Sequence, residues 1–157
     1  MNNLAEIVLN RSIHASQDNA FSFVEDGSDV THLSNSQLFA FATSVAQSLN
    51  EETVPGDRVV LLAPEGMEFV AGFYGCILSS RVVVPTYPPA TARVNRSTLR
   101  FHDLVADVAP AAFLTTADLA RRVKPLLGEL GFDDTPLIEI DLTRAARPSD
   151  SDAAIMP

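Results

Sequence analysis

The sequence predicts an α/β fold in which helices cover a mostly parallel sheet, preceded by an N-terminal β-hairpin. Patterns typical of helices and of strands alternate four times between residues 34 and 141. Residues 58–63 form a continuous aliphatic run, as in a strand buried on both faces of a parallel sheet. Residues 25–29 form a turn-rich pentapeptide between two β-prone segments. We expect right-handed crossovers between the parallel strands.

The N-terminal part of the chain is expected to open with two antiparallel strands, residues 21–24 and 30–33. Ser34 and Gln37 then form a capping box at the start of an amphipathic helix. The apolar face of that helix repeats at helical spacing and consists of Leu38, Phe41, Ala42, Val45 and Leu49.

The middle of the chain contains the most apolar segments. Residues 58–63 are predicted to be a buried strand, which Pro64 ends. Residues 67–78 are apolar almost all round and predict a central, buried helix, in which Gly72 and Gly75 allow another backbone to approach. Residues 82–85 are the next strand, and the prolines that follow predict a stiff extended loop.

Two further helices and two strands are predicted beyond that loop. A helix over about residues 96–108 is expected to bury Phe101, Leu104, Val105 and Val108. Residues 111–115 form a short strand, and Thr116 caps a helix that Pro125 should kink or break. Residues 137–141 are the last strand. We therefore expect residues 1–142 to form one unit and residues 143–157, which have few large apolar groups, to be a linker or mobile tail.

Charge and composition exclude several classes of protein. The 157 residues carry 11 basic and 20 acidic side chains, and a net charge of -9 argues against binding to nucleic acid or anionic lipid. The longest apolar stretch is too short and too glycine-broken for a membrane span, and no signal peptide is recognised, so we expect a cytoplasmic location. Cys76 is the single cysteine, sits in an apolar run and is expected to be a buried, inert thiol.

The side chains of common catalytic and metal sites do not occur in recognisable patterns. The seven glycines form neither a dinucleotide-binding fingerprint nor a phosphate-binding loop. The single lysine, Lys124, lies on the polar side of a predicted helix, and the three histidines lack a second ligand at metal-binding spacing. The sequence also lacks a nucleophile elbow. We therefore assign no catalytic, cofactor-binding or metal-binding residue.

Charge is segregated in one segment. No carboxylate occurs between Glu68 and Asp103, so this stretch is +4 and the rest of the chain is -13, which together give the net charge of -9. Its basic residues are Arg81, Arg93, Arg96 and Arg100. Arginines near a helix start can bind a phosphate, a carboxylate or an acidic partner surface. The alternative is that they pair with acids elsewhere on an acidic protein.

Three segments resemble adenylate-forming enzymes, and the resemblance covers roughly residues 21–141. They are residues 56–62, residues 68–76 and residues 82–89. Within that superfamily, the loop Tyr87-Pro88-Pro89, the helix that follows it and residues 114–116 resemble fatty acyl-AMP ligases. Arg81 departs from the resemblance, because relatives commonly have a small turn of the Ala-Gly-Ala type there.

The resemblance implies an enzyme that converts a fatty acid and ATP, with Mg²⁺, into an acyl-adenylate and then transfers the acyl group to the phosphopantetheine thiol of an acyl carrier protein. In that family the phosphate loop, the nucleotide contacts and the catalytic lysine follow the matched region. Residues 1–142 would thus be part of the N-terminal adenylation subdomain, inactive alone, with residues 143–157 leading to the phosphate-loop region. The residues expected at an acyl-binding wall, or at a carrier or anion contact, are Tyr87, Pro88, Pro89, Arg93, Arg96 and Arg100.

Two alternatives remain open at this level. The parent enzyme could be an acyl-CoA synthetase or another acid-adenylating enzyme, because the opening segment contacts little of the acceptor channel. The chain could instead be a non-enzymatic module that docks on an acidic carrier through its arginine-bearing helix.

Overall fold

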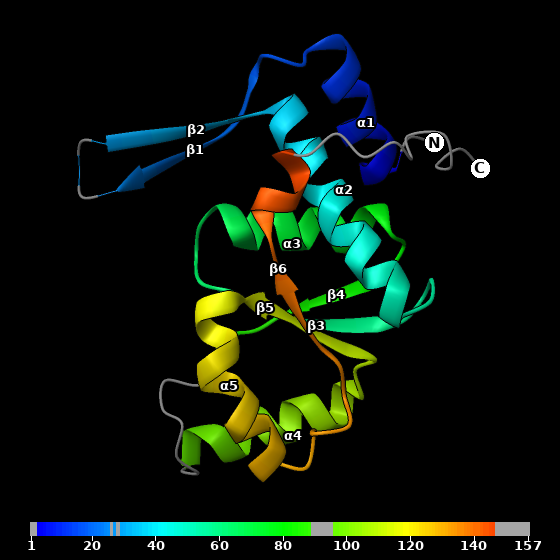
Figure 1. Cartoon of the computed structure of the whole chain (residues 1–157), viewed down its shortest axis with the longest axis vertical. Helices are drawn as coiled ribbons and strands as arrows, with labels where there is room; N and C mark the ends of the chain where they lie inside the picture. Colours follow the sequence, from blue (N-terminus) through cyan, green and yellow to red (C-terminus); the bar gives the residue numbers. More distant parts are fainter. Residues whose placement is uncertain (1–2, 26, 28, 89–95, 147–157) are drawn as a thin grey trace.

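A computed structural model describes residues 3–25, 27, 29–88 and 96–146. A parallel sheet forms the middle of the molecule, and helices cover both of its faces (Figure 1). A separate antiparallel hairpin projects from one end. The predicted α/β class, with a hairpin ahead of a parallel sheet, is therefore confirmed. No helix within these ranges combines the length and the apolar character needed to cross a lipid bilayer.

The parallel sheet has the strand order β4-β3-β5-β6. Its strands are β3 (Arg58–Leu62), β4 (Val82–Pro85), β5 (Ala112–Thr116) and β6 (Leu137–Ile140). In the register, Val60 of β3 lies between Val84 of β4 and Phe113 of β5. Residues 59–62 are fully buried, as the aliphatic run predicts.

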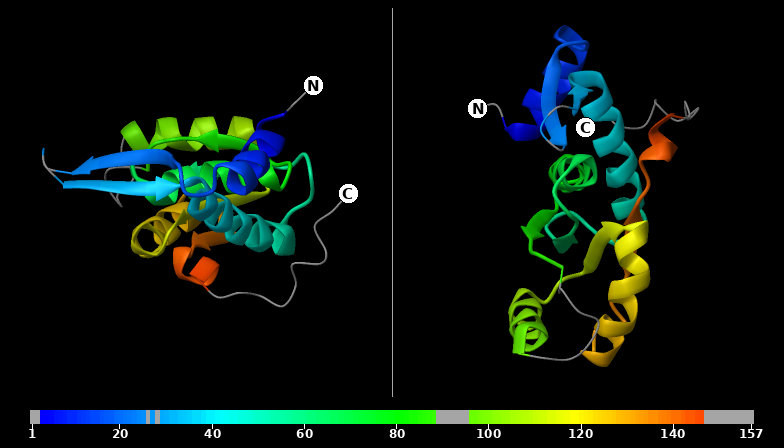
Figure 2. Two further views of the ribbon diagram at one scale, coloured as in Figure 1. Left: turned by 90° about the horizontal axis from the view of Figure 1, so that it is seen from above. Right: turned by 90° about the vertical axis from the view of Figure 1, so that its left-hand side faces the viewer.

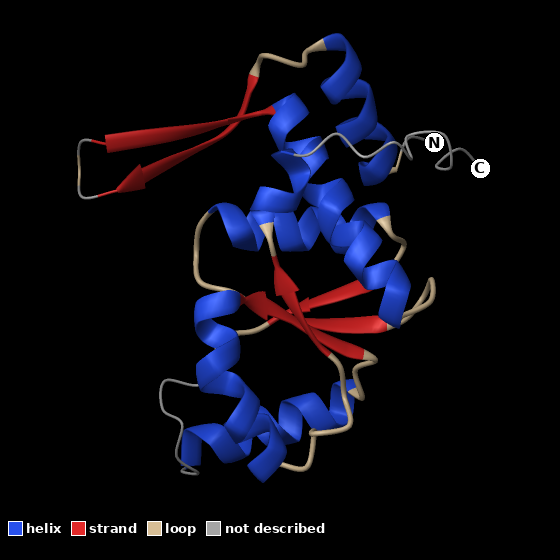
Figure 3. Ribbon diagram, viewed as in Figure 1, coloured by secondary structure: helices blue, strands red, loops and turns tan. Residues whose placement is uncertain are grey.

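The four crossing helices divide evenly between the two faces of the sheet (Figure 3). They are α2 (Asn35–Glu52) and α3 (Met67–Leu78) on one face, and α4 (Arg96–Val108) and α5 (Ala117–Glu129) on the other. Side chains of a strand alternate between the faces. Val59 and Leu61 accordingly join the core under α2 and α3, whereas Val60 and Leu62 join the core under α4 and α5.

The helices α2 and α3 approach each other closely. The predicted capping box at the start of α2 is present: the Gln37 amide donates to Ser34 Oγ at 3.3 Å, and the Ser34 amide donates to Gln37 Oε1 at 2.9 Å. A Cβ atom on Gly75 would lie 2.5 Å from Val45 Cγ1 and 3.2 Å from the Ala42 carbonyl oxygen. The absence of a side chain at Gly75 therefore permits this contact, as the sequence predicts.

The start of the chain differs from the prediction, because a helix, α1 (Leu4–His14), precedes the hairpin. Asn3 and Glu6 form a reciprocal capping box, but Val8 alone of α1 is buried. The helix has no broad apolar stripe, which explains why its periodicity is not visible in the sequence. The hairpin itself is confirmed as β1 (Asn19–Glu25) and β2 (Asp29–Ser34), and Figure 2 shows it as a projecting arm.

The C-terminal half requires two further corrections. Leu104 was expected on the buried face of α4 but is 42% exposed, because it lies at the edge of the apolar face of that helix. Pro125 lies inside α5 without breaking it, and Thr116 caps α5 as predicted. The segment expected to be a linker begins with a 3-10 helix, η1 (Leu142–Ala146), in which Arg144 Nη1 donates to Ser48 Oγ of α2 at 3.1 Å. Residues 147–157 lie outside the described residues.

Candidate functional site

The strand order creates a topological switch point between β3 and β5. The helix α3 leads the chain from β3 to β4 over one face, and α5 leads it from β5 to β6 over the other face. The two connections therefore leave neighbouring strands in opposite directions (Figure 1). In open α/β sheets, ligands bind outside the carboxyl ends of the strands at such a point.

A cavity of about 470 Å³ lies at this edge of the sheet. Segments that follow three different strands line it, and they contribute Pro64, Glu68, Pro88, Thr116, Asp118, Leu119 and Arg122. The volume lies within the range that is usual for small-molecule pockets. The lining combines apolar rings and aliphatic groups with two carboxylates and one guanidinium. The Arg122 guanidinium could bind an anionic group of a ligand, whereas Glu68 and Asp118 would repel it.

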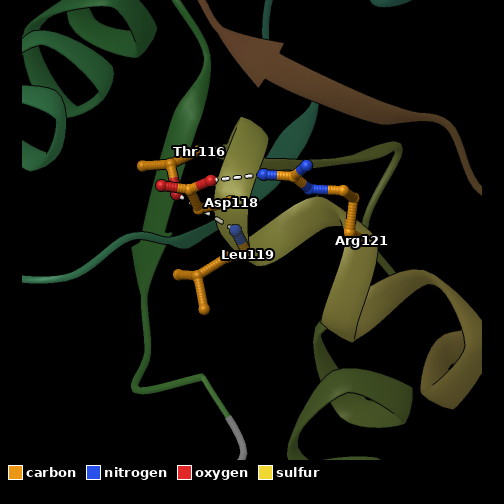
Figure 4. Close-up of polar contacts among 4 residues, drawn as sticks. All are labelled: Thr116, Asp118, Leu119 and Arg121. Carbon is orange, nitrogen blue, oxygen red and sulfur yellow. Dashed lines mark hydrogen bonds and ion pairs between the residues drawn. The ribbon is translucent and has the colours of Figure 1, made fainter.

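The start of α5 contributes Thr116, Asp118 and Leu119 to the lining of the cavity. Figure 4 shows the polar contacts of this segment. The Leu119 amide donates to Thr116 Oγ1 at 3.4 Å, and Asp118 pairs with Arg121 at 2.5 Å. Thr115 Oγ1, one residue earlier, donates to the Leu62 carbonyl oxygen at 2.6 Å and links the ends of β5 and β3. Asp118 and Arg121 are largely exposed, so their pair contributes at most about 1 kcal/mol and serves mainly to orient Asp118.

The structure separates the residues that the sequence proposes for the site. Pro88 lines the cavity, and Tyr87 directly before it is 83% exposed. Arg96 and Arg100 are exposed on α4, do not line the cavity and form no ion pair with a described residue. Pairing of these two arginines with acids elsewhere is therefore absent from the described part of the chain. Pro89 and Arg93 lie outside the described residues.

Six lining residues were not predicted, because they are far apart in sequence and mostly ordinary in type. They are Pro64, Glu68, Thr116, Asp118, Leu119 and Arg122. A signal was nevertheless present: each residue follows closely on a predicted parallel strand, and the carboxyl ends of such strands meet at one edge.

Arg81 belongs to the core of the fold and not to the candidate site. Its side chain is 5% exposed, at the amino end of β4. Two of its hydrogen bonds go to Thr53: Nε donates to Oγ1 at 2.9 Å, and Nη2 donates to the carbonyl oxygen at 2.6 Å. Nη1 donates to Asn50 Oδ1 at 2.6 Å and also to the Ser79 carbonyl oxygen. The guanidinium therefore joins the C-terminal ends of α2 and α3, where a cation is favoured. Burial lowers the pKa of Arg81, whereas Asp57 raises it.

Cys76 is fully buried in α3, as predicted. Burial raises the pKa of its thiol to about 12, an effect that the charge of Arg81 partly offsets. We expect the native protein to react with an aromatic disulfide reagent at about pH 8 far more slowly than an exposed thiol, because the thiolate is scarce and inaccessible. The unfolded protein should release one equivalent of chromophore promptly, and equally rapid release by the native protein would contradict the burial.

Comparisons with known proteins agree on one family. The family described as AMP-binding enzyme matches residues 11–154. Medium-chain-fatty-acid--[acyl-carrier-protein] ligase JamA of Moorena producens is 30% identical over 128 residues, which are 81% of this chain and 22% of that relative. Long-chain-fatty-acid--AMP ligase FadD28 of Mycobacterium tuberculosis is 33% identical over 138 residues, which are 84% of this chain and 23% of that relative.

A solved structure shows the same arrangement of elements. The fatty acyl-adenylate ligase from L. pneumophila, in complex with acyl adenylate and pyrophosphate, superposes with a TM-score of 0.77 and is 27% identical. The superposition covers 93% of this chain and 25% of that protein. The chain thus spans about a quarter or less of these three proteins.

Proposed function

Because this chain belongs to the AMP-binding enzyme family, we propose that it is the N-terminal part of a fatty acyl-AMP ligase. The reaction joins a carboxylate oxygen of a fatty acid to the α-phosphorus of ATP and breaks the bond to the β-phosphate, which releases pyrophosphate. The observation that carries the proposal is the 33% identity to a long-chain-fatty-acid--AMP ligase over 84% of the chain, and the superposition on a fatty acyl-adenylate ligase agrees with it. The names of two similar proteins, a medium-chain and a long-chain fatty acid ligase, support the same class of substrate.

The role proposed for this chain is to form one wall of the acyl-binding site. Pro64, Pro88 and Leu119 give the cavity apolar lining at the sheet edge where ligands of α/β proteins bind. Pro88 has a rigid backbone, so this wall is held without the entropy cost of ordering a flexible loop. Such a wall contributes by positioning the fatty acid, since the attacking nucleophile is the substrate's own carboxylate.

The sequence motifs and the described residues of this chain provide no recognised site for ATP or Mg²⁺. The sequence contains no glycine-rich phosphate loop. Across the described ranges, no group of three or more acidic, histidine or cysteine side chains could hold a metal ion. We therefore assign neither group to these residues, and we propose that the 157-residue chain alone does not form an adenylate.

The proposed acceptor of the acyl group is the phosphopantetheine thiol of an acyl carrier protein. The thiol sulfur would attack the acyl carbonyl carbon, and AMP would leave. The name of the relative JamA, an acyl-carrier-protein ligase, supports this acceptor. Contact of Arg93, Arg96 and Arg100 with a carrier or another anion stays a prediction. Transfer to coenzyme A, or carrier docking without catalysis, are the competing functions.

A chimaera tests the proposal directly. In it, this chain replaces the matching segment of FadD28, and pyrophosphate release is measured with fatty, aryl and amino acids. We expect release with fatty acids from the chimaera and only background ATP-pyrophosphate exchange from the chain alone. Leu119→Asp in the chimaera should raise the KM for the fatty acid at least tenfold, because a charge at the apolar wall costs binding free energy.

The controls separate the parts of the proposal. Val54→Asp alters an exposed valine away from the cavity and should leave the KM for the fatty acid unchanged. Exchange by the chain alone would contradict its proposed inactivity. A folded chimaera that prefers aryl or amino acids would contradict the fatty-acid assignment, and acyl-CoA as the favoured product would replace the carrier as acceptor.

A further inference from the structure

The outer face of α4 carries an ordered charge stripe. Its members, at spacings of four, three and four residues, are Arg96, Arg100, Asp103 and Asp107. At 3.6 residues per turn these four positions fall within an arc of about 60°. All four residues are exposed, whereas Phe101 and Val105 on the opposite side of the helix are buried.

Two leucines flank the charge stripe. Leu99 is 51% exposed and lies along one edge, and Leu104 is 42% exposed and lies along the other. The helix itself occupies the end of the molecule opposite the hairpin (Figure 2, right). The outer face of α4 thus combines charges of both signs with two partly exposed leucines.

The order of charges is unfavourable within one helix. Arginines at the N-terminal end and aspartates at the C-terminal end both oppose the helix macrodipole. Each like-charged pair is also separated by four residues, so its members repel each other. Among the described residues, the polar side-chain contact that the stripe makes is the hydrogen bond between His102 Nδ1 and Asp103 Oδ1 at 3.2 Å. The sequence therefore carries a local cost that something outside this helix should offset.

We propose that α4 is a self-association surface, on which the α4 helix of a second copy packs antiparallel about a two-fold axis. In such an arrangement, a residue of one copy lies at the same height along the helix axis as a residue of the other copy when their two residue numbers add up to a fixed value. Here 96 and 107, 100 and 103, and 99 and 104 all sum to 203, so each arginine of one copy lies level with an aspartate of the other. The leucines border the charged contacts on both edges.

A second copy suits this face better than an acidic carrier does. An acidic surface would attract Arg96 and Arg100 but would be repelled by Asp103 and Asp107 at the other end of the stripe. A second copy satisfies all four charges and aligns the two helix dipoles antiparallel. A helix of 13 residues is only about 20 Å long, so one such pair buries less than the roughly 1,200 Å² of a standard interface. The association should therefore be weak and sensitive to salt.

Sedimentation velocity over about a hundredfold range of protein concentration at low salt tests the proposal. The acidic variant combines Arg96→Asp with Arg100→Asp, and the basic variant combines Asp103→Arg with Asp107→Arg. Each variant alone should associate at least tenfold more weakly than the unaltered chain, because like charges then meet across the axis. An equimolar mixture of the two should form a heterodimer, since every contact then joins opposite charges.

Circular dichroism will check that each variant is folded. Arg121→Asp with Lys124→Asp changes the net charge as much as the acidic variant does, but on α5, and should leave association unchanged. A chain that stays monomeric at every concentration would overturn the proposal, as would a mixture that associates no better than its components. Binding of an acyl carrier protein that falls in the acidic variant and rises in the basic variant, without self-association, would assign the stripe to the carrier instead.

Discussion

Replacing Gly75 with alanine should lower the free energy of unfolding by about 2 kcal/mol, because the new methyl group would overlap Val45. The Cβ atom would lie 2.5 Å from Val45 Cγ1 and 2.6 Å from Val45 Cβ, and 3.2 Å from the backbone oxygen of Ala42. The Cβ atom of Val45 is fixed to the backbone of α2, and the Ala42 carbonyl oxygen belongs to that backbone. Neither atom can therefore move away from the new methyl group by a side-chain rotation. The two helices must therefore separate, which weakens the core that they share with the sheet. Urea denaturation of the purified protein measures the effect.

Two other helical glycines provide matched controls for Gly75→Ala. Gly128 lies in α5, where an added Cβ would be 3.9 Å from Asp133 Cβ, so Gly128→Ala should stabilise the protein by up to about 1 kcal/mol through helix propensity. At Gly72, the Cβ would meet the ends of leucine and isoleucine side chains, which can move, and the loss should be smaller than at Gly75. Val45→Ala combined with Gly75→Ala should recover part of the loss. Equal stability of Gly75→Ala and Gly128→Ala would show that the contact between α2 and α3 is loose in solution.

Local signals in the sequence predicted most of the fold correctly. The capping box of Ser34 and Gln37 and the aliphatic run of β3 each depend on residues within a few positions of one another. The strands β1 and β2, which pair as predicted, are neighbours in the sequence. The helix α1 was not predicted, because it buries one residue and its sequence therefore carries no repeating pattern of core residues. Asn3 and Glu6 nevertheless have the spacing of a capping box at a helix start. Its stability comes from contacts with later elements, which no local pattern encodes.

The candidate site was predicted only in part, because it is an assembly of strand ends. Pro88 was singled out by its own loop, whereas Pro64, Leu119 and Arg122 become neighbours only through the order of strands in the sheet. Arg81 shows the opposite error: charge counting grouped it with the exposed arginines, yet it is buried among uncharged acceptors. The sequence reveals the charge of a side chain. Its burial and its hydrogen-bond partners depend on packing between distant segments, as for Arg81 and Thr53, which are 28 positions apart.

Replacing Arg81 with methionine should destabilise the protein by about 3 kcal/mol. Methionine retains much of the apolar stem but leaves the carbonyl oxygens of Thr53 and Ser79 without the donors that now satisfy them. Hydrogen bonds to a charged group contribute about 1.5–3 kcal/mol each, and the cost of burying the guanidinium offsets part of this. Arg81→Lys should give an intermediate loss, since one ammonium group cannot span both helix ends. Arg58→Met removes the same charge from an exposed position on β3 and should change stability by less than about 0.5 kcal/mol.

The salt dependence of the Arg81→Met effect distinguishes its two physical sources. Asp57 also acts on Arg81 through its charge, and this long-range attraction should weaken as salt is added. The two hydrogen bonds to Thr53 are buried, the one to Asn50 is partly buried, and all three are directed at uncharged acceptors, so their contribution should persist in high salt. We therefore expect the difference in unfolding free energy to remain nearly constant between low and high salt. A difference that largely disappears would assign the stabilisation to Asp57, and a double-mutant cycle of Arg81→Met with Thr53→Val would then show little coupling.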